Sequence, residues 1–123
     1  MIKSNDPLLK IEEFKKFNEG RHFGEGVAPS KEVADIATRL VKQAIEFSLD
    51  TDVFPGIAGE IMVTVYHKDY YLEFTIENNK KITYVYEEND EEIDCIESLT
   101  IKDSLIKLQN FNNKKCNISG IKK

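Results

Sequence analysis

The chain has 123 residues and a net charge of −5, with 41% hydrophobic and 32% charged residues. This length suits one domain around one hydrophobic core, and the composition excludes a disordered chain. The acidic balance argues against non-specific binding to nucleic acid or an anionic membrane, because phosphate contacts need surplus lysine and arginine.

Neither a targeting segment nor a cysteine framework is apparent. Residues 1–7 lack the apolar run of a signal peptide, and no window reaches the roughly 20 apolar residues of a membrane helix. Cys95 and Cys116 have neither a metal-site spacing nor the density of a disulfide scaffold. We therefore expect a cytoplasmic protein without a membrane segment.

The N-terminal region predicts a short helix and then a glycine-containing loop. Asp6 and Pro7 form a helix-start signal, which predicts a peripheral helix over residues 7–18. Residues 20–29 contain three glycines ahead of the next helix. No strand precedes this loop and no Gly-Lys-Ser/Thr sequence ends it, so its glycines are expected to permit turns and not to bind phosphate.

The strongest helical pattern follows this loop and predicts a core helix over residues 30–48. Ser30 opens it, and apolar residues recur at the spacing of one helical face. These residues are Val33, Ile36, Ala37, Leu40, Val41, Ala44 and Phe47. Residues 50–56 then indicate the end of the helix and a structured turn anchored by Phe54.

Residues 59–97 predict an antiparallel β-meander of three or four strands. The segments 60–66, 70–77, 81–87 and 92–97 are separated by short polar turns. In the second segment Leu72, Phe74 and Ile76 alternate with polar residues, which is typical of a sheet covered on one side only. The charges of the last segment suit an edge strand, and Cys95 is expected there on a core face with Ile93.

The C-terminal region predicts a second packed helix over residues 101–111, with Thr100 as its N-cap. Residues 112–123 are polar and basic, and we expect them to form a flexible tail. The predicted fold class is therefore α+β: an antiparallel three- to four-stranded meander packed on the long helix and the C-terminal helix. Residues 1–111 are expected to form one domain.

Three motifs occur in order along the chain: FGEGVAPS at 23–30, VFPGIAGEI at 53–61 and YYLEF at 70–74. An acidic segment leading to residues 98–100 follows them. From residue 17 to about residue 108, three quarters of its length, the chain resembles a widespread set of small bacterial proteins of unknown function. The resemblance implies no catalytic, cofactor or metal residue, and residues 112–123 lie outside it.

Groups suited to catalysis or metal binding are sparse. His22 and His67 are the only histidines, and no pair of residues has a metal-ligand spacing. His67 is expected to be solvated at a strand end. Because nucleophilic catalysis needs an activated Ser or Cys, a base and an orienting group, we expect a non-enzymatic protein without cofactor or metal.

An acidic run ends the meander. Its members, with no basic residue between them, are Glu87, Glu88, Asp90, Glu91, Glu92, Asp94 and Glu97. Such a run predicts either a solvated turn and edge strand or a negative surface that docks on a basic partner. For the second interpretation the candidate partner-binding residues are Glu87, Glu88, Asp90, Glu91, Glu92, Asp94, Tyr71 and Glu73.

Three functional hypotheses remain open. The first is a protein-binding regulator or inhibitor of antitoxin-like, immunity or anti-defence (anti-CRISPR) type, docking on a basic protein through an acidic edge and an open sheet face. The second is a nucleic-acid-binding module with the helix–sheet–helix order of a double-stranded RNA-binding domain, although the helix starting at Ile101 lacks the expected lysine cluster. The third is a small-ligand or enzymatic role at the loop 20–29, which depends on Gly24 and Gly26.

Overall fold

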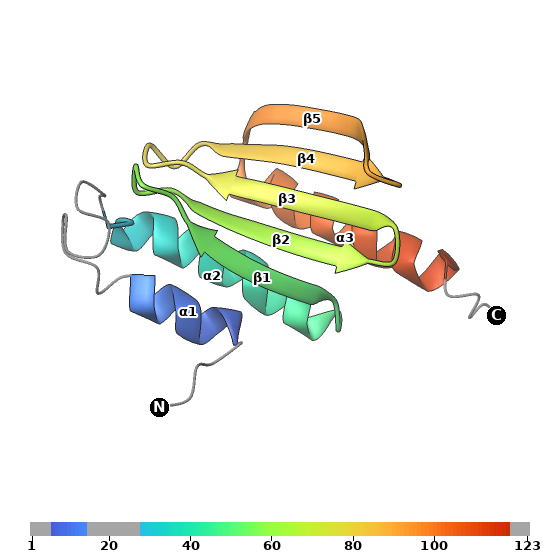
Figure 1. Cartoon of the computed structure of the whole chain (residues 1–123), viewed down its shortest axis with the longest axis horizontal. Coiled ribbons are helices and arrows are strands. Elements are labelled where there is room, and N and C mark those ends of the chain that lie inside the picture. Colours follow the sequence, from blue (N-terminus) through green and yellow to red (C-terminus); the bar gives the residue numbers. More distant parts are fainter. Residues whose placement is uncertain (1–5, 15–27, 119–123) are drawn as a thin grey trace.

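Five strands and three helices form the fold. The computed structural model describes residues 6–14 and 28–118. The elements are α1 (Pro7–Phe14), α2 (Lys31–Glu46), β1 (Asp50–Pro55), β2 (Ile61–His67), β3 (Tyr70–Ile76), β4 (Ile82–Glu88), β5 (Glu91–Leu99) and α3 (Ile101–Ile118). The strands form one antiparallel sheet in the order β1-β2-β3-β4-β5, with the helices on one side of it (Figure 1). The α+β class and the meander are confirmed, with five strands in place of three or four.

The helix α2 packs on strands β1, β2 and β3 of the sheet, as expected from its apolar face. Ser30 is its N-cap, and the Ser30 Oγ accepts a hydrogen bond from the N–H of Val33 at 3.2 Å. The buried side chains of this helix are Val33, Ala34, Ala37, Leu40, Val41 and Ala44. Three alanines on this face leave room for the larger side chains of the sheet.

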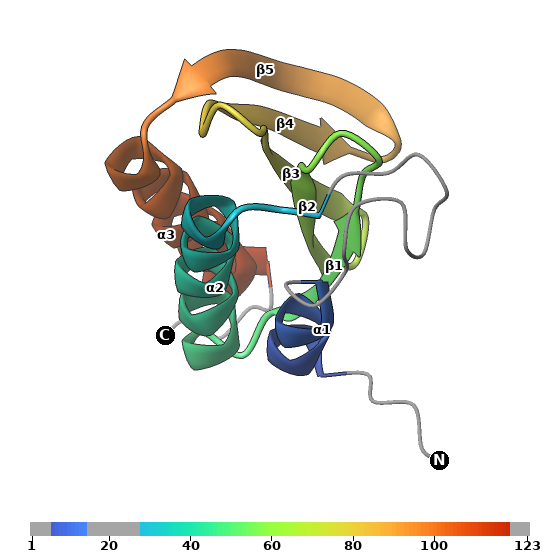
Figure 2. The same cartoon turned by 90° about the vertical axis from the view of Figure 1, so that its left-hand side faces the viewer.

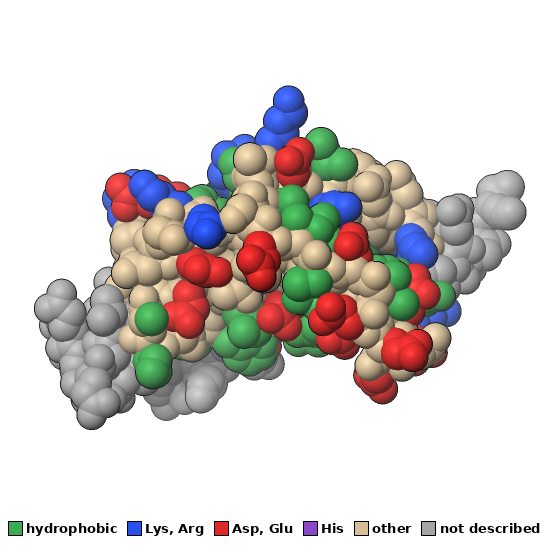
Figure 3. All heavy atoms as spheres, turned by 90° about the horizontal axis from the view of Figure 1, so that it is seen from above, with side chains coloured by type: hydrophobic (Ala, Val, Ile, Leu, Met, Phe, Trp, Pro, Cys, Tyr) green, Lys and Arg blue, Asp and Glu red, His purple; other side chains and the backbone are tan. Residues whose placement is uncertain are grey.

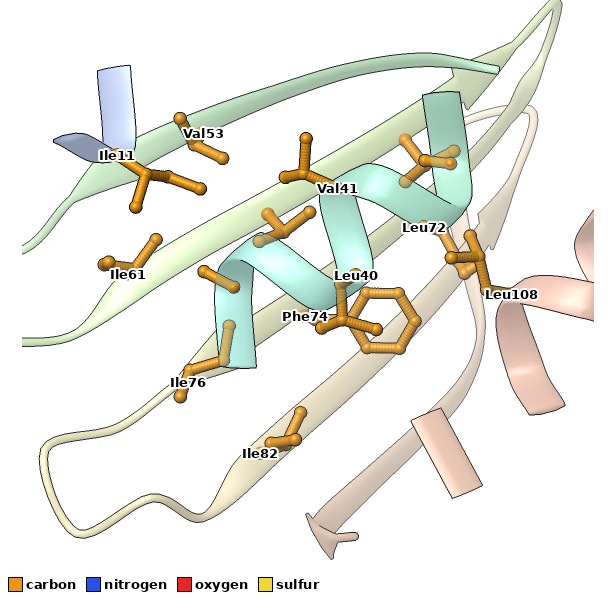
Figure 4. Close-up of a cluster of buried hydrophobic side chains, with 14 of the residues drawn as sticks. Ile11, Leu40, Val41, Val53, Ile61, Leu72, Phe74, Ile76, Ile82 and Leu108 are labelled. Carbon is orange, nitrogen blue, oxygen red and sulfur yellow. The ribbon is translucent and has the colours of Figure 1, made fainter. Parts of the chain in front are cut away.

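The hydrophobic core lies between the sheet and the helices (Figure 4). Strands β2 and β3 each place three fully buried side chains on the inner face of the sheet: Ile61, Val63, Val65, Leu72, Phe74 and Ile76. Each residue of the first trio lies opposite one of the second in the β2–β3 register. The alternation predicted for these strands is therefore confirmed.

Strand β1 was not predicted, because residues 50–56 were interpreted as a helix end and a turn. The segment pairs with β2 from Asp50 opposite Tyr66 to Pro55 opposite Ile61. Only Val53 in it is buried, at 1% exposure. An edge strand pairs on one side only, so it tolerates both this weak apolar pattern and a proline without an N–H donor.

The helix α1 begins at Pro7 as predicted and is described to Phe14, while the predicted residues 15–18 lie outside the described residues. Its Ile11 is fully buried and belongs to the hydrophobic core. The helix is thus not peripheral, because Ile11 completes the core beside β1 and α2. Residues 20–27 of the predicted glycine-containing loop, with Gly24 and Gly26, also lie outside the described residues.

The helix α3 begins after its predicted N-cap but continues to Ile118, well beyond residue 111. The Thr100 Oγ1 accepts a hydrogen bond from the N–H of Asp103 at 3.0 Å. Farther along, Lys114 Nζ lies 3.2 Å from a carboxylate oxygen of Glu88, and Lys115 Nζ donates to the backbone carbonyl of Phe47 at 2.7 Å. Residues 112–118 are thus helical and do not form the predicted flexible tail, and residues 119–123 of that prediction lie outside the described residues.

Within the described part of the chain, no helix has the length and apolar character needed to cross a membrane.

Candidate functional site

The side of the sheet that faces away from the helices is the outer sheet face, and no described helix covers it (Figure 2). Alternation and strand register assign to this face Asp52, Phe54, Met62, Thr64, Tyr66, Tyr71, Glu73, Thr75, Thr83, Val85, Glu87, Glu92 and Cys95. Seen from above, Asp and Glu side chains lie close together with hydrophobic side chains among them (Figure 3).

One row of residues crosses the outer sheet face from β2 to β5. Tyr66 lies opposite Tyr71, Tyr71 opposite Glu87, and Glu87 opposite Glu92. Glu73 is two residues from Tyr71 on the same face of β3. Four of the eight candidate residues therefore lie in or beside this row: Tyr71, Glu73, Glu87 and Glu92.

The other four candidate residues are not part of this row, although Asp90 lines the same cavity as Tyr71 and Glu87. Glu88 and Asp94 are on the helix side of the sheet, where they form ion pairs with Lys114 and Lys107 at 3.2 and 3.9 Å. Asp90 lies in the β4–β5 turn, and Glu91 is opposite Glu88. The acidic run thus divides between two faces, because successive residues of a strand point to opposite sides of the sheet.

Two tyrosine side chains are held in place on the outer sheet face. The Tyr71 hydroxyl donates to Glu73 Oε1 at 2.7 Å, and the Tyr66 hydroxyl accepts from Thr64 Oγ1 at 2.8 Å. The ring centroids of Tyr66 and Tyr71 are 5.6 Å apart, with planes tilted by 49°. Burial, and then the bond to Glu73, raise the pKa of Tyr71 above its ordinary value of 10.0, so this phenol stays protonated and continues to donate in alkaline solution as well as at neutral pH.

A cavity of about 330 Å³ opens beside these rings, between the β2–β3 and β4–β5 turns. It is lined by Tyr66, Lys68, Asp69, Tyr70, Tyr71, Glu87, Asn89 and Asp90. In the β4–β5 turn, Asn89 and Asp90 have φ angles of 53° and 67°, a left-handed conformation that Asn and Asp adopt more readily than most residues. The lining combines aromatic rings with three carboxylates and one ammonium group.

Sequence reasoning did not include Tyr66 among the candidate residues. Tyr66 and Tyr71 are equally distant from the two-residue turn at Lys68 and Asp69, and they face each other across the hairpin. The hairpin spacing was the signal that could have identified this pair.

Like charges oppose each other at the β4–β5 edge. Glu87 lies opposite Glu92, and Glu88 lies opposite Glu91. Directly opposed like charges destabilise a sheet. Lys114 offsets the charge of Glu88, whereas Glu87 and Glu92 form no ion pair within residues 6–14 and 28–118. Among the described residues, neither carboxylate of the opposed pair Glu87 and Glu92 is therefore neutralised by an ion pair.

The charge of Glu88 should contribute to stability in a pH-dependent way. Hydrogen bonds from the Tyr86 hydroxyl and then from Lys114 lower the pKa of Glu88 below its ordinary value of 4.5. Because the pKa of Glu88 is lower in the folded than in the unfolded chain, the ionised carboxylate stabilises the fold above pH 4.5. This stabilisation is lost as the pH falls through the lowered pKa. We expect Glu88→Gln to lower the melting temperature at neutral pH, and the difference from wild type to shrink in acid.

The measurement is a pair of thermal unfolding series from neutral pH to below pH 4.5. Glu91→Gln is the matched control, because Glu91 lies directly opposite Glu88 but forms no ion pair in the described part of the chain. If the difference in melting temperature between wild type and Glu88→Gln stays constant across this pH range, the lowered pKa of Glu88 is contradicted.

His67 and Cys95 differ from their predicted environments. The Nε2 atom of His67 is buried without a hydrogen-bond partner among the described residues, and the side chain lies beside Phe111 and α3. The side chain is therefore half-buried and not fully solvated, because the last residue of β2 faces the helices. Cys95 is exposed on the outer sheet face, and Ile93 is 55% exposed, because the β4–β5 register shifts beside them.

Neither an activated thiol at Cys95 nor a metal-binding cluster occurs among the described residues. Desolvation, and then Glu92 and the neighbouring carboxylates, raise the pKa of the Cys95 thiol, which makes it a poor nucleophile at neutral pH. No group of three or more His, Cys, Asp or Glu side chains that could hold a metal ion occurs in residues 6–14 and 28–118.

Comparison with known proteins gives no match to a family model, a curated protein or a solved structure. The resemblance to a set of small bacterial proteins stays a prediction. The charge and shape of the outer sheet face are therefore the ground for a functional proposal.

Proposed function

We propose that this protein is a non-enzymatic regulator or inhibitor that docks through its outer sheet face on a basic surface of another protein. The observation that carries the proposal is the opposed pair Glu87 and Glu92, which lies beside Tyr71 and Glu73 without an ion pair in the described part of the chain. A cation from a partner placed between these carboxylates relieves their repulsion and gains an ion pair at the same time.

The aromatic content of the same face supports docking. Tyrosine is enriched in protein interfaces and often acts as an anchor that carries much of the binding energy. Tyr66 and Tyr71 are already held by hydrogen bonds to Thr64 and Glu73. Because these rings lose little freedom on binding, less of the interaction energy is spent on ordering them.

A basic protein is a better partner for this face than a nucleic acid. The outer sheet face carries carboxylates, and phosphate groups would be repelled by them. The lysines of α3 are also partly occupied, since Lys107 pairs with Asp94 and Lys114 pairs with Glu88. An inhibitor of antitoxin, immunity or anti-defence type, which occupies a basic groove that otherwise binds nucleic acid, fits this charge distribution.

Affinity capture tests the proposal. The immobilised full chain is exposed, at about 0.15 M salt, to a lysate of the cells that produce it, with and without nuclease, and the eluate is identified by mass spectrometry. We expect one protein with a basic surface to be retained in near-equal amount after nuclease treatment. Recovery of nucleic acid alone, or loss of all retained protein after nuclease, would contradict the proposal.

A further inference from the structure

The cavity between the β2–β3 and β4–β5 turns has the chemistry of a cation site. We propose that an arginine side chain of the basic partner occupies it, with its guanidinium against the rings of Tyr66 and Tyr71 and paired with Glu87. This inference rests on the proposed function and identifies the anchor of that same face.

Three lysines of the chain itself show the same arrangement of groups around a cation. Each lies beside a carboxylate and over an aromatic ring: Lys10 with Asp52 and Phe54, Lys107 with Asp94 and Tyr84, and Lys114 with Glu88 and Tyr86. Their Nζ atoms are 2.6, 3.9 and 3.2 Å from the carboxylate oxygens and 5.5, 5.2 and 5.6 Å from the ring centroids, respectively. Attraction to a ring and to a carboxylate act together at each cation.

The outer sheet face has a fourth combination of aromatic rings and a carboxylate, but no described lysine or arginine is paired with it. Tyr66, Tyr71 and Glu87 line one cavity, and no lysine or arginine of the described residues lies over either ring or pairs with Glu87. Lys68 also lines the cavity, but the three carboxylates of the lining outnumber it and leave a net negative charge. The site therefore favours a positively charged occupant.

Arginine fits this lining better than lysine. Its planar guanidinium stacks on an aromatic face and gives two parallel N–H bonds to one carboxylate, whereas an ammonium is a compact, strongly hydrated charge. The cavity of about 330 Å³ is at the small end of the range for ligand pockets, roughly 300–1,000 Å³, so it suits one side chain. Glu87 lies opposite Tyr71 in the β3–β4 register, so one occupant can meet both groups.

A peptide titration tests the site on the full chain. The probe is a glycine-flanked triarginine peptide, and its neutral counterpart carries citrulline, which keeps the shape of arginine and lacks the charge. The signal is the chemical shift of the Tyr66 and Tyr71 ring protons. We expect saturable shifts with the arginine peptide, weaker ones with the equivalent lysine peptide and none with the citrulline peptide.

Substitutions in matched pairs distinguish the contribution of the two tyrosine rings to peptide binding from that of the overall negative charge. For the variants, binding of the arginine peptide is measured by calorimetry, because the leucine variant lacks both reporting rings. Tyr66→Leu with Tyr71→Leu should weaken this binding by roughly fivefold to thirtyfold. The two Tyr→Phe changes should retain most of the affinity because the ring faces remain. Glu87→Gln should weaken binding more than Glu77→Gln, whose carboxylate lines the separate cavity near Asn78. Equal binding of the citrulline peptide, or full affinity in the leucine variant, would overturn the proposal.

The outcomes for the anchor and for the proposed function are distinguishable. If a captured basic protein needs the carboxylates of the outer sheet face but binds the leucine variant at full strength, the arginine anchor is overturned and the proposed function stands. If the arginine peptide shifts both rings but no protein is captured, the anchor is supported and the proposed function is overturned.

Discussion

Replacing Phe74 by alanine should lower the free energy of unfolding by about 3–5 kcal/mol. Phe74 lies in the middle strand of the sheet, is fully buried and packs with its ring centroid 5.7 Å from that of Tyr84. Figure 4 shows the ring beside Leu40 of α2. Removing the ring leaves a cavity at the point where sheet and helix meet, and a domain with a total stability of about 5–15 kcal/mol would lose a large share of it.

The measurement is urea unfolding followed by circular dichroism, with Phe54→Ala as the matched control. Phe54 is also a strand phenylalanine, but it is 43% exposed, and Lys10 Nζ lies 5.5 Å from its ring centroid. We expect this control to lose about 1 kcal/mol or less. Equal losses of the free energy of unfolding in Phe74→Ala and Phe54→Ala would contradict the position of Phe74 in the hydrophobic core.

The sequence allowed the faces of the central strands to be predicted. Leu72, Phe74 and Ile76 alternate with polar residues, and this pattern is unambiguous because the described helices all lie on one side of the sheet. The core face of α2 followed from its helical spacing, and Ser30 was a clear N-cap. Each of these signals is local to one element, so it can be detected without a three-dimensional structure.

Other features depend on partners that are distant in the sequence. Strand β1 contains one buried side chain, Val53, and it becomes a strand only because β2 is beside it. The far end of α3 is polar, and Lys115 holds it through a carbonyl 68 positions away in the chain. Neither contact leaves a periodic signal in the local sequence.

The candidate site could be predicted only in part, for a geometric reason. A run of acidic residues predicts a charged surface, yet alternation sends Glu87 and Glu88 to opposite sides of the sheet. A register shift in the β4–β5 pair then exposes Cys95, which simple alternation from Ile93 assigned to the core. Which carboxylates share a face is set by the pairing of strands and not by their order in the chain.

Neutralising three carboxylates of the outer sheet face should weaken binding to the captured partner by about tenfold to a hundredfold, if each exposed ion pair contributes about 0.5–1 kcal/mol. The change is Glu73, Glu87 and Glu92 to glutamine. The fold should not lose stability, because the substitution removes the repulsion between Glu87 and Glu92, and a glutamine at 73 still offers an oxygen to the Tyr71 hydroxyl. An unchanged melting temperature would show that lost binding is not lost folding.

The measurement that tests the central claim most directly compares this variant with one that removes the same charge from the helices. The second variant changes Glu13, Glu32 and Glu46 to glutamine, three exposed residues of α1 and α2. Affinity of each for the captured partner is measured by calorimetry at the same salt concentration. If the partner docks on the outer sheet face, the variant with the three sheet substitutions binds weakly. The variant with the three helix substitutions then binds nearly as well as wild type. Equal losses would show that only net charge matters, and full affinity of the first variant would place the binding site elsewhere.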